Sequence, residues 1–112
     1  MNFRKNFGND GELLARKFLA YRGLAILATN FHAKEGEVDL ICRENSTIIF
    51  VEVKARKSQK FGSAVESVSD AKIEKIVQAG QKFLLENNLE NADWRVDLIL
   101  IEGGKLQWLK GI

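Results

Sequence analysis

The 112-residue sequence has one cysteine, one histidine and no long apolar segment. The single cysteine, Cys42, excludes an internal disulfide and a cysteine-based zinc cluster. It follows Ile41 in an apolar segment, which favours a small core residue over a catalytic thiol. His32 has no other histidine to bind a metal with, and we interpret it as a loop or surface residue.

The lack of apolar segments also bears on location. No run approaches the ~20 residues of a membrane-spanning helix, and residues 1–7 lack the apolar stretch of a secretory signal. We therefore expect a cytoplasmic protein with no membrane partner. With 17 Lys and Arg against 15 Asp and Glu, the formal charge of +2 is too small to indicate nucleic-acid binding by itself. The length fits a single domain over residues 1–112, with residues 1–8 loosely held.

The most informative segment runs from Gly36 to Lys54 and reads as two strands joined by a polar turn at residues 44–46. The second strand is rich in β-branched and aromatic residues, as expected of a central strand. Glu52 interrupts it, and Lys54 lies on the same face, roughly 6–7 Å further along. A carboxylate buried in such a strand costs several kcal/mol unless it is compensated. We therefore expect Glu52 to meet a cation or a metal ion.

Asp39 interrupts the first strand in the same way. If the turn closes a hairpin, Asp39 and Glu52 lie close together at one end of the sheet. Two adjacent carboxylates repel, so one pKa rises unless a divalent cation neutralises them. Mg²⁺ typically takes one or two carboxylates and completes its shell with water and phosphate oxygens. With Lys54 beside the metal to orient a water molecule, the pattern indicates metal-assisted phosphodiester hydrolysis.

A longer pattern carries a family resemblance. Its pieces are Gly11-Glu12-x-x-Ala15, Gly23, Asn30, Gly36-Glu37-Val38-Asp39-Leu40-Ile41, Phe50-Val51-Glu52-Val53-Lys54-x-Arg56, Lys72 and Arg95-Val96-Asp97. The chain thereby resembles the YraN-like family of small bacterial proteins, which is assigned to the PD-(D/E)xK nuclease superfamily. Val38 stands where the name of the superfamily has proline. This position varies in the superfamily.

The resemblance implies a restriction-endonuclease-like fold and an activity similar to that of Holliday-junction-resolvase-like endonucleases. It implies Mg²⁺ or Mn²⁺ held by Asp39 and Glu52 together with the carbonyl of Val53, and Lys54 positioning the attacking water. It also implies that Glu12, on the first helix, joins the metal site. The residues themselves leave a second interpretation open, in which Glu12 forms a capping box with Asn9 at the start of that helix.

The remaining elements follow from periodicity and turn residues. The first helix, from Asn9 to Gly23, should bury Leu14, Phe18 and Tyr21, with Leu19 beside them. A strand should form at residues 24–29, before the two strands of the Gly36–Lys54 segment. A second helix, capped by Ser69 or Asp70, should run to residue 86. Strands at residues 94–101 and 106–109 should follow and form a hairpin through a glycine turn. Asn30 should close the strand that begins at residue 24. The fold class is therefore α/β, with an αβββαβ core, a mixed sheet flanked by helices and an extra C-terminal edge strand. The first three strands should form an antiparallel meander, and the helical crossover should make the third and fourth parallel.

Basic residues follow the third strand. Four of the seven residues from Lys54 to Lys60 are basic, and the run begins at the candidate site. We assign Arg56, Lys57 and Lys60 to contacts with a phosphate backbone. Lys72 joins them, because a lysine in the first turn of a helix opposes the helix dipole and so suggests an anionic partner.

Two functions fit these features. The first is a Mg²⁺- or Mn²⁺-dependent endonuclease that hydrolyses DNA, including branched or structured DNA, as a possible homodimer. The second is a non-catalytic nucleic-acid-binding module with a nuclease-like fold. An intact set of Asp39, Glu52 and Lys54 favours the enzyme, and the small net charge favours the module.

Overall fold

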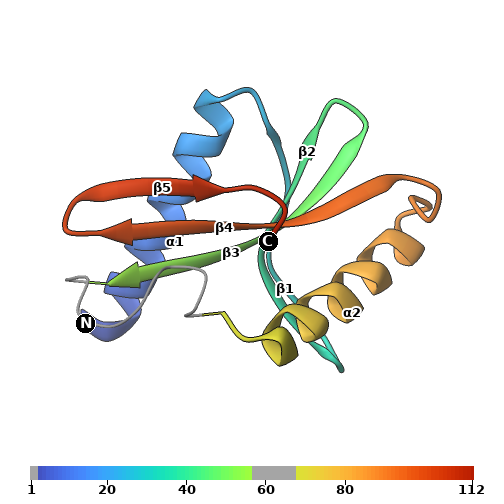
Figure 1. Cartoon of the computed structure of the whole chain (residues 1–112), viewed down its shortest axis with the longest axis horizontal. Coiled ribbons are helices and arrows are strands. Elements are labelled where there is room, and N and C mark those ends of the chain that lie inside the picture. Colours follow the sequence, from blue (N-terminus) through green and yellow to red (C-terminus); the bar gives the residue numbers. More distant parts are fainter. Residues whose placement is uncertain (1–2, 57–67) are drawn as a thin grey trace.

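The computed structural model describes residues 3–56 and 68–112, with side chains from Asp10 onward. The elements are α1 (Phe3–Tyr21), β1 (Ala25–Ala33), β2 (Gly36–Glu44), β3 (Thr47–Arg56), α2 (Asp70–Glu86), β4 (Asp93–Glu102) and β5 (Lys105–Leu109) (Figure 1). This order confirms the predicted αβββαββ arrangement. No helix in these two ranges is both long and apolar enough to cross a membrane.

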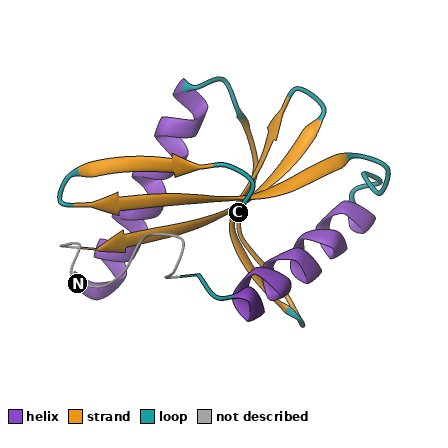
Figure 2. Ribbon diagram, viewed as in Figure 1, coloured by secondary structure: helices purple, strands orange, loops and turns teal. Residues whose placement is uncertain are grey.

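The strands form one mixed sheet in the order β1-β2-β3-β4-β5. Neighbouring strands pair antiparallel except β3 and β4, which are parallel. The structure therefore confirms the α/β fold class, with a meander, a helical crossover and an added C-terminal edge strand. Figure 2 shows the two helices well separated from one another around this sheet.

The two helices pack on opposite faces of the sheet, and β3 supplies buried side chains to both. Phe50 points toward α2, and its ring lies so close to Gly80 that a Cβ there would be 2.5 Å from it. Ile49, the preceding residue, packs instead in the cluster that contains Ala15 and Leu19 of α1. Alternation along a strand explains this division. It also places Glu52, two residues after Phe50, on the α2 side.

Helix α1 corrects two predictions. It begins at Phe3, so Asn9 lies inside the helix and is not its N-cap; no proline precedes Asn9 to stop the helix from extending. Among its described side chains, from Asp10 onward, the buried ones are Ala15 and Leu19, whereas Leu14 and Tyr21 are 49% and 89% exposed.

The reason is the closeness of α1 to the sheet. A Cβ on Gly11 would lie 3.2 Å from the Cβ of Ala55. Small side chains permit this approach, so the helix presents Gly11 and Ala15 to the sheet, while Leu14 and Tyr21 point outward. Phe18, half-buried, is the predicted stripe residue that does pack against the core.

Strand β1 is also longer than predicted. Asn30 does not close it: the pairing with β2 continues to Ala33. Asn30 has φ 50°, a left-handed conformation that asparagine tolerates well, so the chain changes direction there without leaving the sheet. The other turn predictions hold. The Ser69 Oγ caps α2 by accepting from the N–H of Lys72 at 3.1 Å, and Gly103 and Gly104 both have positive φ in the β4–β5 turn.

Candidate active site

Asp39 lies where the β2–β3 ladder ends. The last residues paired in register are Leu40 and Val51. The next bond is made by a side chain: the N–H of Val53 donates to Asp39 Oδ2 at 2.8 Å. In an antiparallel pair the N–H and the C=O of one residue face the same neighbouring strand. The carbonyl of Val53 therefore faces the same end of β2 as its N–H.

Glu52 meets Asp39 at this end of the sheet. Continuation of the β2–β3 register puts the two residues opposite each other, and Glu52 is only 5% exposed. Burial, side-chain hydrogen bonding to Asp39 and the negative charge of Asp39 raise the pKa of Glu52 to about 7, against the opposing effect of Lys72 and Lys54. The structure thus brings together the two carboxyl groups that the sequence singled out, with Lys54 close enough to Glu52 to act on its pKa.

A second lysine, Lys72 of α2, lies beside this pair of carboxylates. Lys72 Nζ lies 3.5 Å from Glu52 Oε2. The sequence assigned Lys72 to an anionic partner, and in the structure its ammonium lies beside the carboxylate of Glu52; the assignment to phosphate contacts stays a prediction. The sequence held a signal for this position, because a lysine three residues after the cap Ser69 is unfavourable for the helix dipole and so suggests a negative neighbour.

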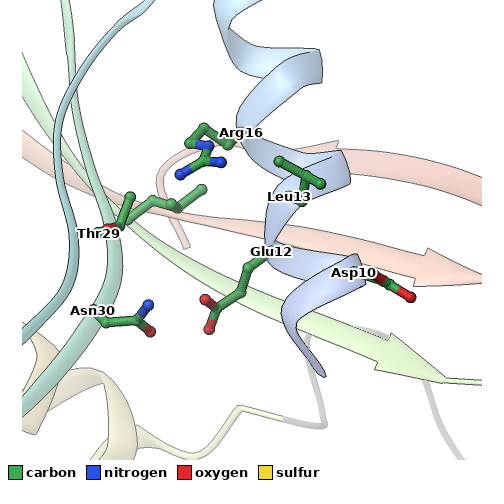
Figure 3. Close-up of a pocket in the computed structure, with 7 residues that line it drawn as sticks. Asp10, Glu12, Leu13, Arg16, Thr29 and Asn30 are labelled. Carbon is green, nitrogen blue, oxygen red and sulfur yellow. The ribbon is translucent and has the colours of Figure 1, made fainter. Parts of the chain in front are cut away.

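Glu12 approaches from α1. Its carboxylate and the amide of Asn30 point toward one another (Figure 3), and Asn30 lies opposite Asp39 in the β1–β2 register. Burial raises the pKa of Glu12 above its ordinary value, and the charges of Asp39 and Glu37 act in the same direction, whereas hydrogen bonding from Asn30 lowers it. Glu12 therefore faces the site across Asn30 and does not cap its helix.

A pocket of about 250 Å³ lies between α1 and β1 beside Glu12 and Asn30. Arg16 extends along the same pocket toward Thr29 (Figure 3). Asn30 was interpreted from the sequence as the end of a strand. Its place in the family pattern was the only sign of a role near Asp39.

The oxygen donors fit a small divalent cation. Within residues 3–56 and 68–112, no group of three or more His, Cys, Asp or Glu side chains is arranged to hold a metal. Mg²⁺ does not need one, because it is commonly bound through one or two carboxylates and keeps several waters. Asp39, Glu52 and the Val53 carbonyl suit this requirement.

Comparison with known proteins gives the family. The model of the uncharacterised protein family UPF0102 matches residues 11–101. The chain belongs to the UPF0102 family. It is similar to UPF0102 proteins of Saccharophagus degradans (44% identity over 92% of this chain and 88% of the relative) and Neisseria gonorrhoeae (41% over 100% and 98%). A UPF0102 protein of Vibrio parahaemolyticus is 40% identical over 96% of this chain and 91% of its own length. The resemblance is confirmed at the level of the family, and the superfamily assignment stays a prediction.

Of the basic residues Arg56, Lys57 and Lys60 of this UPF0102 protein, the structure describes Arg56, the last residue of β3. Arg56 Nη2 lies 2.8 Å from Glu102 Oε2 of β4, although the two groups are not aligned as a hydrogen bond. Arg56 thus has a partner within the protein. Lys57 and Lys60 lie outside the described residues, and their assignment to phosphate contacts stays a prediction.

A second buried carboxylate, that of Asp97, has a structural role. Asp97 is fully buried and accepts hydrogen bonds from Arg95 Nε, Trp108 Nε1 and the N–H of Gly111, each at 2.9 Å. These bonds join β4, β5 and the C-terminal segment. Every oxygen of Asp97 is occupied, so this carboxylate stabilises the fold and is separate from the Asp39–Glu52 pair.

Proposed function

We propose that this UPF0102 protein is a divalent-metal-dependent endonuclease that hydrolyses phosphodiester bonds in DNA, with branched or structured DNA as the expected substrate. The observation that carries the proposal is the meeting of Asp39 and buried Glu52 beside two lysines. The resemblance to the PD-(D/E)xK superfamily supports the same reaction class. A cytoplasmic location, inferred from the sequence, accords with such a substrate.

The residues would divide the work as follows. Asp39 and Glu52 would hold Mg²⁺ or Mn²⁺ together with the carbonyl of Val53. The bound cation would supply a Lewis acid and a water molecule of lowered pKa. Lys54, on the same strand face as Glu52, would orient the attacking water and offset negative charge on the phosphate. Glu12 would support the site from α1.

The ionisation of Glu52 sets the pH dependence of metal binding. Its pKa of about 7 in the metal-free protein means that protons and the metal compete for this carboxylate near neutral pH. Metal affinity should therefore rise as the pH increases through about 7. Calorimetric titrations with Mn²⁺ on both sides of this pH would measure the effect.

The direct test is cleavage of linear, flapped and four-way DNA in the presence of Mg²⁺ or Mn²⁺. Asp39→Ala serves as the inactive control and Asp39→Asn as the variant of matched size. We expect the natural sequence to cut at least one substrate, and Asp39→Asn to lose cutting while it still binds DNA. Cutting that survives in both variants would contradict the assignment of Asp39.

One observation favours the alternative, a non-catalytic nucleic-acid-binding module. The protein compensates its own acidic pair: Val53 donates to Asp39, and Lys72 lies beside Glu52. A module predicts no cutting of any substrate and no change in melting temperature with millimolar Mn²⁺. An enzyme predicts a metal-dependent rise in melting temperature, because a ligand bound only by the folded state stabilises it. Asp39→Asn should abolish that rise.

A further inference from the structure

Lys72 occupies an unusual position for a helical lysine. It lies in the first turn of α2, where the helix dipole disfavours a positive charge. Its own N–H is fixed by the Ser69 cap, and the helix is anchored one turn further on by Ile76, which is 1% exposed. The backbone of Lys72 is therefore held firmly over the sheet, and its ammonium is directed to Glu52.

The contact between the two side chains is asymmetric. The side chain of Glu52 is 6% exposed, whereas that of Lys72 is 40% exposed, and their charged atoms are 3.5 Å apart. The carboxylate is immobilised in the sheet, but the lysine head can return to water on its flexible stem without uncovering apolar surface. The ammonium of Lys72 can therefore stabilise the carboxylate of Glu52 and still be displaced from it.

The surroundings of Glu52 indicate what would displace this ammonium. Asp39 adds a second negative charge at the same point, and its carboxylate is fixed by the N–H of Val53. A divalent cation neutralises this pair of carboxylates more fully than a single ammonium does, because its two positive charges match the two negative charges. The cation and Lys72 would compete for the same oxygen region of Glu52.

We propose that Lys72 is an internal counter-cation of the Asp39–Glu52 pair, which neutralises Glu52 in the metal-free protein and competes with the divalent cation for it. This inference rests on the proposed function, because it requires a metal at this pair. Lys72 is then a positioning residue that keeps the two carboxylates together before the metal binds. It also sets the metal concentration at which the site is filled.

The test is Mn²⁺ binding, measured by calorimetry at constant salt and at one pH well above 7, where Glu52 is ionised in every variant and protons do not compete with the metal. Lys72→Gln removes the charge, Lys72→Arg keeps it, and Lys82→Gln removes an exposed lysine from the same helix as a matched control. Lys72→Gln should bind Mn²⁺ about two- to fivefold more tightly than the natural sequence, the range set by a partly exposed ion pair. Lys72→Arg and Lys82→Gln should bind as the natural sequence does.

Melting curves supply a readout that does not depend on catalysis. Without metal, Lys72→Gln should melt at a lower temperature than the natural sequence, and saturating Mn²⁺ should reduce the difference. A Lys72→Gln variant that binds Mn²⁺ equally or more weakly would overturn the inference and leave the nuclease proposal intact. If the natural sequence itself binds no Mn²⁺, both proposals fail together, so the two failures are distinguishable.

Discussion

Replacement of Glu52 by glutamine should change how the stability of the metal-free protein depends on pH. The folded protein raises the pKa of Glu52 from the ordinary value of 4.5 to about 7, chiefly by burial. Between these values the folded state keeps a proton that the unfolded chain has released. The favourable contribution of protonated Glu52 is therefore complete below about 4.5 and is lost as the pH rises through about 7. A rise of this size corresponds to roughly 3 kcal/mol.

Glu52→Gln should remove this pH-dependent loss of stability, because glutamine keeps the size of the side chain and cannot ionise. The free energy of unfolding, from urea denaturation at a series of pH values without metal, should fall by roughly 3 kcal/mol more in the natural sequence than in Glu52→Gln. Glu90→Gln, at an exposed position, is the matched control and should follow the natural sequence. Subtraction of the two curves cancels the contribution of every group that titrates alike in both proteins. Parallel curves for the natural sequence and Glu52→Gln would refute the reasoning.

Three further predictions concern the core, the buried carboxylate of Asp97 and the basic residues Arg56, Lys57 and Lys60. Gly80→Ala should lower the free energy of unfolding by about 1–2 kcal/mol, because the new methyl group meets the Phe50 ring at a cost that exceeds the gain in helix propensity; a more stable variant would show that the helix moves aside freely. Asp97→Asn should cost about 3 kcal/mol, since it removes a buried charge whose oxygens accept from Arg95, Trp108 and Gly111 and leaves Arg95 only its contact with Glu44, whereas Asp93→Asn, exposed on the same strand, should be neutral in the same denaturation assay. Loss of the basic residues at and beyond the end of β3 should reduce the slope of log DNA affinity against log salt by about one per phosphate contact, and an unchanged slope would exclude these residues from the interface. The variant for that test carries alanine at Arg56, Lys57 and Lys60.

The candidate site was largely readable from the sequence because its two acids interrupt strongly apolar strands. A short polar turn between two such strands predicts an antiparallel hairpin, and the hairpin register alone brings Asp39 opposite Glu52. The helical companions of the pair were harder to predict. Glu12 had two equally plausible roles, since a capping box and an inward-facing acid look alike in one sequence. Only the packing of α1 on the sheet directs its carboxylate toward Asn30.

Local patterns determined the order of the elements, the cap of α2, the glycine turn of the last hairpin and the parallel crossover, because each depends on neighbouring residues or on a general rule of chain connection. Tertiary structure decided which side of α1 is buried. Periodicity favoured the larger apolar residues, but the helix lies so close to β3 that only the side of Gly11 and Ala15 fits there. Tertiary structure also decided the partners of Arg56 and Lys72. Long charged side chains pair with whichever acid the fold brings near, and the spacing of residues in the sequence does not reveal which acid that is.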